Sequence, residues 1–95
     1  MSAREAYQQK LEAKLNETKA DIDKLKAKAD SAQADAKLEM YEDIERLRKR
    51  EERVQAKLIE LGEAGESAWE DVKAGAESAW EDLRSSFEKA RDRFS

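Results

Sequence analysis

The chain has 95 residues and a net charge of −4, and 44% of its residues are charged whereas only 6% are aromatic. Such a length allows one small domain at most, and this composition leaves little material for a globular core. The absence of cysteine and histidine excludes disulfides, zinc–thiolate sites and the commonest general base.

The first predicted element is a long helix over residues 3–61, rich in strong helix formers and free of proline and glycine. Its apolar positions begin at Leu11 and recur at alternating intervals of four and three residues, the heptad pattern of a helix that packs along a partner helix. The pattern weakens over residues 27–36, where alanine replaces leucine, and it takes an extra step of four residues at Met40. Glu51 falls on a core position, where a charge weakens the packing. We expect a heptad coiled-coil domain over 1–61, about 90 Å long if unbroken, and any turn inside it to lie in 27–36.

Residues 62–66 are predicted to form a break or hinge. Gly62 and Gly65 each disfavour a helix interior, and Ser67 followed by Glu70 matches the capping box that begins a helix. The alternative is a helix that continues through residue 65, because the same box recurs at Ser78 inside the next element.

The last element, residues 67–95, is predicted to be an amphipathic helix with an eleven-residue period. The stretches AGESAWEDVKA (64–74) and GAESAWEDLRS (75–85) are near-copies of one another. Eleven residues span three turns of an unstrained helix, so the stripe runs along the helix axis, and Trp69 and Trp80 lie one above the other along one edge of it. Residues 63–95 carry five basic and nine acidic side chains, so this segment holds the whole net charge.

Three interpretations of this apolar face remain open: packing against another helix, binding to a membrane surface, or a helix that folds only conditionally. Packing is favoured because anionic lipid would repel the acidic polar face, and because the ordered apolar positions argue against disorder. The basic stretch RLRKREER (46–53) is the nearest candidate for phosphate contact. Acidic residues interrupt and flank it, so a solvated helix face is favoured and no nucleic-acid partner is predicted.

No catalytic, cofactor-binding or metal-ligating residue is predicted. Carboxylate pairs such as Glu66/Glu70 are expected by chance in so acidic a chain, and no phosphate-binding or calcium-binding loop motif is present. Tyr7 and Tyr41 are expected to pack against a partner. Because a rod offers little to build a pocket, we expect no enzymatic activity and no cofactor. No secretory signal or membrane span is visible, and a cytoplasmic location is expected.

Several segments together resemble a family of short bacterial coiled-coil proteins labelled as stress-response proteins. They are IDKLKAKADSAQADAK (22–37), RVQAKLIEL (53–61) and the duplicated AWED repeat followed by spaced phenylalanines. The resemblance covers nearly the whole chain, and the tandem tryptophan repeat is its most specific part. It implies a cytoplasmic, helical, non-enzymatic protein.

We therefore predict an all-α protein, in which a long heptad helix and a shorter eleven-residue-repeat helix form a hairpin or an oligomeric helical bundle. The predicted function is a self-associating structural or interaction coiled coil with a role in stress; the alternative is a peripheral protein of lipid or granule surfaces. The residues predicted to mediate self-association are Leu11, Leu15, Ile22, Leu25, Ile44, Leu47, Val54, Leu58, Leu61, Trp69, Val72, Trp80, Leu83, Phe87 and Phe94.

Overall fold

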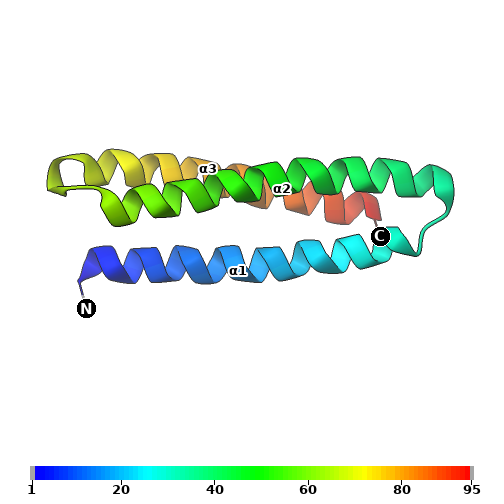
Figure 1. Cartoon of the computed structure of the whole chain (residues 1–95), viewed down its shortest axis with the longest axis horizontal. Coiled ribbons are helices and arrows are strands. Elements are labelled where there is room, and N and C mark those ends of the chain that lie inside the picture. Colours follow the sequence, from blue (N-terminus) through cyan, green and yellow to red (C-terminus); the bar gives the residue numbers. More distant parts are fainter. Residues whose placement is uncertain (1, 95) are drawn as a thin grey trace.

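The computed structural model describes residues 2–94, and over that range the chain forms three α-helices and no strand (Figure 1). They are α1 (Ala3–Asp30), α2 (Ala34–Glu63) and α3 (Glu66–Phe94). Each helix turns back along the one before it, so α1 and α3 run in the same direction and α2 runs opposite to both (Figure 1). The molecule measures 51 × 20 × 18 Å. The predicted all-α class is confirmed.

The single helix expected over 3–61 is wrong, because the chain reverses at residues 31–33. There the amide of Ser31 donates to the carbonyl of Lys28 and the amide of Ala32 to that of Ala29, at 3.2 and 3.0 Å. This three-residue spacing closes a helix end. Gln33 then adopts an extended backbone that any residue tolerates, so the turn needs neither glycine nor proline. The reversal falls in the alanine-rich stretch 27–36 and shortens the expected rod of about 90 Å to 51 Å.

The second connection consists of residues 64 and 65, within the segment where a break was expected. The carbonyl of Gly65 accepts the amides of Ala68 and Trp69 at 3.1 and 3.0 Å, so α3 begins at Glu66. Ser67 therefore lies inside the first turn of α3 instead of capping it. The alternative of a helix continuing through residue 65 does not describe this chain.

One core runs the length of the molecule, where the apolar stripes of the three helices meet. The heptad spacing of α1 and α2 keeps one face of each helix toward its neighbours, and the alanines of α3 permit close approach. Glu51, predicted at a core position, has a side chain that is only 13% exposed, and its carboxylate pairs with Arg48 at 3.0 Å. The buried apolar residues are Leu11, Leu15, Ile22, Leu25, Ala29, Ile44, Leu47, Val54, Leu58, Leu61, Trp69, Ala76, Ala79, Leu83, Ala90 and Phe94.

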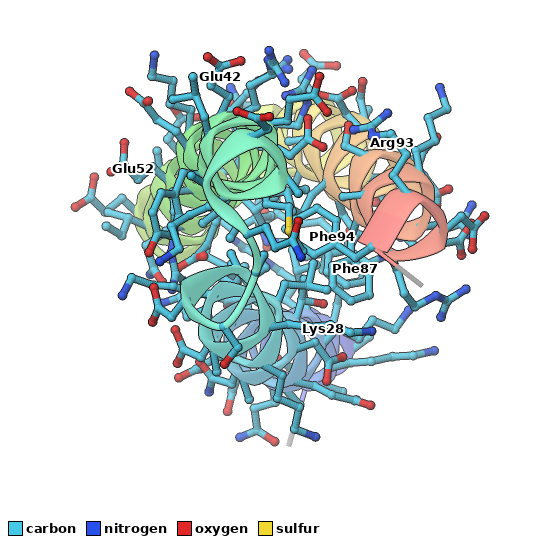
Figure 2. All side chains as sticks on the ribbon, turned by 90° about the vertical axis from the view of Figure 1, so that its right-hand side faces the viewer. Lys28, Glu42, Glu52, Phe87, Arg93 and Phe94 are labelled. Atoms are coloured by element: carbon cyan, nitrogen blue, oxygen red, sulfur yellow. The ribbon has the colours of Figure 1, made fainter. Side chains whose placement is uncertain are left out.

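Charged side chains radiate outward from all three helices, whereas Phe87 and Phe94 point inward (Figure 2). A few polar contacts join neighbouring helices: Lys19 donates to the side-chain oxygen of Gln55 at 3.2 Å, and the Tyr41 hydroxyl donates to Asp30 across the first turn. The latter hydrogen bond lowers the pKa of Asp30 and raises that of Tyr41. Among residues 2–94, no helix carries an apolar run long enough to span a membrane.

Candidate functional site

The interface between α1 and α3 is the least closely packed of the three helix pairs. Along its outer side a depression of about 290 Å³ opens near the start of α1, and a second of about 230 Å³ opens near its end. We call this feature the α1–α3 groove. The lining residues are Tyr7, Lys10, Leu11, Lys14, Glu77, Trp80 and Glu81 at the first depression, and Asp21, Lys24, Leu25, Phe87 and Arg91 at the second.

The eleven-residue repeat explains why α3 presents aromatic side chains to this groove. Ala76, Ala79 and Leu83 occupy the centre of its stripe and are almost completely buried. Trp80 lies at the edge of the stripe and Phe87 repeats the position of Ala76 eleven residues later; both are half-buried, as is Tyr7 on α1. The ammonium of Lys14 lies 5.9 Å from the centre of the Trp80 ring, a cation–π distance. The groove is therefore a partly covered aromatic surface with cations beside it.

Trp69, the counterpart of Trp80 in the repeat, has a different environment. It is 7% exposed and packs edge-to-face on Tyr7, with ring centres 5.8 Å apart. Arg4 and Lys73 lie over its ring at 5.2 and 5.5 Å, and Arg4 also donates to the carbonyl of Ala64 at 2.6 Å. Its indole nitrogen is buried without a hydrogen-bond partner among the described residues. Trp69 is thus held in the core by ring contacts, and Trp80 is the tryptophan that the groove presents.

The two walls of the groove carry opposite charges at its wider end. Lys10 and Lys14 line the α1 side, and Glu77 and Glu81 line the α3 side. Burial, reinforced by the negative charge of Glu77, raises the pKa of Tyr7 to about 12. A hydrogen bond from Arg84 lowers the pKa of Glu81, which keeps that wall negative. The walls are therefore charge-complementary.

The structure places most of the residues predicted for self-association inside one chain. Val72, Trp80 and Phe87 are half-buried against the core. The others lie in the core itself: Leu11, Leu15, Ile22, Leu25, Ile44, Leu47, Val54, Leu58, Leu61, Trp69, Leu83 and Phe94. Their partner helices are consequently those of the same chain.

Sequence reasoning missed three exposed large side chains on α2: Leu38, Tyr41 and Ile59, which are 64%, 37% and 55% exposed. Tyr41 was expected to pack against a partner, and it lies at the surface. Leu38 and Ile59 fall outside the heptad positions, so the period that identified the core gave no signal for them. Within the part of the chain that the structure describes, no group of three or more acidic, histidine or cysteine side chains could hold a metal ion.

Comparison with known proteins gives no relative: no family model, no curated protein and no solved structure matches this chain. The likeness to the bacterial stress-response family remains a prediction from the sequence segments described above.

Proposed function

We propose that this chain is a non-enzymatic structural or interaction protein of coiled-coil type, in which the α1–α3 groove binds a second copy of the chain. The observation that carries the proposal is the half-buried position of Trp80. With Phe87 and Tyr7 it forms an aromatic surface that the helices of one chain cover only in part. Aromatic side chains of this kind supply much of the binding energy at protein interfaces.

The charge pattern of the groove favours a second copy as the occupant. In a dimer with two-fold symmetry each surface meets its own copy, so the surface must complement itself. The basic α1 wall, with Lys10 and Lys14, can then face the acidic α3 wall of the other chain, with Glu77 and Glu81. This arrangement brings the aromatic residues of both chains together at the centre.

The oligomer is expected to be weak. The main apolar stripes already pack against one another within the chain. In the groove, the exposed edges of Trp80, Phe87 and Tyr7 are what remains for association, and apolar area stabilises by about 25 cal/mol per Å². The complex should therefore dissociate on dilution. A cytoplasmic location and a role in stress, which the family resemblance implies, are part of the proposal.

The second candidate is a peripheral protein of lipid or granule surfaces. Trp80 near Lys10 and Lys14 favours it, because tryptophan and lysine side chains suit the boundary between headgroups and acyl chains. The acidic residues of the α3 wall argue against anionic lipid.

Sedimentation equilibrium over a range of protein concentrations, with and without vesicles, tests the proposal. The wild-type chain should associate as concentration rises, and Trp80→Ala should shift association to roughly tenfold higher concentration, since an interface tryptophan is typically worth more than 1 kcal/mol. Ile59→Ala is the matched control, because Ile59 is 55% exposed and lies on α2, outside the groove. Monomers at every concentration would refute self-association. Vesicle binding that requires Trp80 would favour the second candidate.

A further inference from the structure

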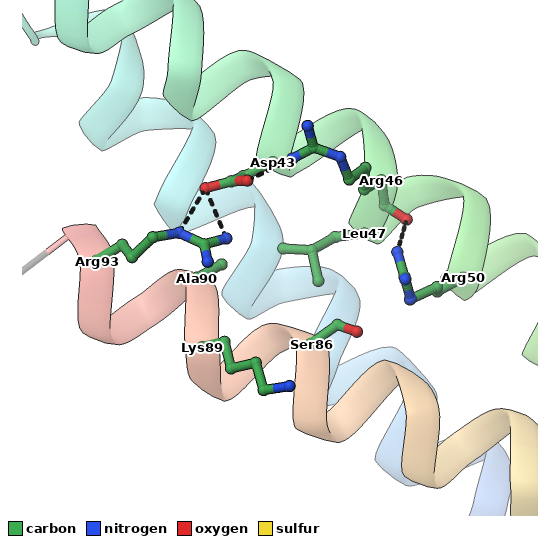
Figure 3. Close-up of a pocket in the computed structure, with 8 residues that line it drawn as sticks. All are labelled: Asp43, Arg46, Leu47, Arg50, Ser86, Lys89, Ala90 and Arg93. Atoms are coloured by element: carbon green, nitrogen blue, oxygen red, sulfur yellow. Dashed lines mark hydrogen bonds and ion pairs between the residues drawn. The ribbon is translucent and has the colours of Figure 1, made fainter.

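A depression of about 260 Å³ lies between α2 and α3, on a different face from the α1–α3 groove, and half of its lining residues are cationic (Figure 3). Four of its side chains are basic and one is acidic, although the chain as a whole has a net charge of −4. The lining residues are Asp43, Arg46, Leu47 and Arg50 from α2 and Ser86, Lys89, Ala90 and Arg93 from α3.

Asp43 holds two guanidinium groups at one end of this depression. Its carboxylate accepts a bond of 2.7 Å from Arg46 and bonds of 3.0 and 2.9 Å from Arg93, and its side chain is only 12% exposed. Each guanidinium has five N–H donors, and one carboxylate cannot accept all ten. Asp43 therefore fixes the positions of Arg46 and Arg93. Arg46 is also ion-paired with Glu42 at 3.9 Å, so the donors left for another acceptor are chiefly those of Arg93.

The opposite side of the depression adds two donors that the protein does not use. The ammonium of Lys89 and the hydroxyl of Ser86 have no side-chain hydrogen bond or ion pair among residues 2–94. Both lie on α3, across from Arg50, whose Nη1 donates to the carbonyl of Arg46 at 3.3 Å (Figure 3). The Nε of Arg50 donates to Asp82 at 3.1 Å. The restrained arginine and the unpaired lysine thus face the same small volume.

We infer that this depression is a binding site for a phosphate group. Guanidinium groups match the geometry of phosphate oxygens and bind them through paired N–H donors, while lysine supplies a point charge. A volume of about 260 Å³ is small for a drug-sized ligand and suits a single tetrahedral anion. The group could be carried by a phosphorylated small molecule or by a lipid headgroup, since the recognised chemistry is the same.

The site also changes the interpretation of the basic stretch RLRKREER. On α2 alone acidic residues interrupt and flank its cations, as expected of a solvated face. Folding places Lys89 and Arg93 of α3 beside Arg46 and Arg50, and this juxtaposition concentrates positive charge that neither segment has alone. A purely structural role, in which the ion pairs only join α2 to α3, would not require Lys89, because Lys89 makes no ion pair there.

The test titrates the full-length protein with inorganic phosphate and follows backbone amide resonances by NMR, against sodium chloride at equal ionic strength. Phosphate, but not sodium chloride, should cause saturable shifts of the amide resonances of residues that line the depression. Lys89→Gln should bind phosphate roughly tenfold more weakly, the effect of one lost charge-assisted contact, without a change in unfolding midpoint. Lys28→Gln, an exposed lysine of α1 outside the depression, is the matched control.

Vesicles of phosphatidylcholine with and without phosphatidic acid distinguish the two sources of the phosphate group. Phosphate binding that depends on Lys89 supports the site with a free ligand, and vesicle binding that depends on Lys89 and on phosphatidic acid supports it with a lipid. The inference is overturned if chloride reproduces the shifts and vesicles do not bind, or if Lys89→Gln and Lys28→Gln behave alike. A loss of stability in Lys89→Gln as large as its loss of phosphate binding would also overturn the inference, because the lysine would then be structural.

Discussion

Truncation of Leu83 tests whether the core within one chain stabilises this fold. Leu83 lies in the middle of α3 and is completely buried. Its replacement by alanine removes three carbon atoms, which costs roughly 2.4 kcal/mol at about 0.8 kcal/mol each. The space that remains raises the cost to about 3 kcal/mol, because the surrounding side chains can only partly collapse into it. Small domains are stable by about 5–15 kcal/mol, so the loss is easily measured.

Urea unfolding followed by circular dichroism, at protein concentrations low enough for the monomer, measures this loss. Ile59→Ala is the control, because Ile59 is 55% exposed and alanine favours the helix slightly, so its effect should stay within about 0.5 kcal/mol. A cost below about 1 kcal/mol for Leu83→Ala, or one equal to that of Ile59→Ala, would refute the packing described for α3.

Two further predictions concern α3 and the groove. Gly75→Ala should raise the free energy of unfolding by about 1 kcal/mol, because alanine favours a helix interior. Its new carbon would lie 3.6 Å from Cε of Lys57, an ordinary contact distance. A decrease in the urea midpoint would show that the space beside Lys57 is too small for this carbon. The pKa of Tyr7 rises from 10.0 to about 12 on folding, so its contribution to stability is complete below pH 10 and is lost as pH rises toward 12. Wild type should therefore lose more stability than Tyr7→Phe over that interval in urea titrations at several pH values, and identical losses would contradict the position given to Tyr7.

The core was predictable from the sequence because it depends on a local period. Leu11, Ile22 and Leu47 follow heptad intervals, and the structure buries all three. The period says which face of a helix is buried, but it does not say which helix covers that face. For this reason the sequence left open whether these residues pack within a chain or between chains, and the structure places them in contact within one chain.

The turn at residues 31–33 was harder to predict than the connection near Gly65. No glycine or proline marks it, since Ser31 and Gln33 adopt backbone conformations open to any residue. The weak alanine stretch and the extra step at Met40 were its only signals, and they restricted the place of a turn without requiring one.

The candidate sites depend on which helices become neighbours, and the sequence does not contain that information in a local pattern. The repeat made Trp69 and Trp80 equivalent, whereas Tyr7 from α1 covers only Trp69 with an edge-to-face contact. The basic depression likewise forms only when Lys89 comes to lie beside Arg46. Both distinctions arise from tertiary packing.

Fluorescence of Trp80 alone tests the proposed self-association most directly. Trp69→Phe leaves Trp80 as the sole tryptophan and keeps an aromatic ring against Tyr7. The proposal predicts emission that is blue-shifted at high protein concentration, moves to the red on dilution, and ignores vesicles. Emission that stays red at every concentration and shifts to the blue only when vesicles are added would contradict it, and the groove would then be a lipid-binding surface.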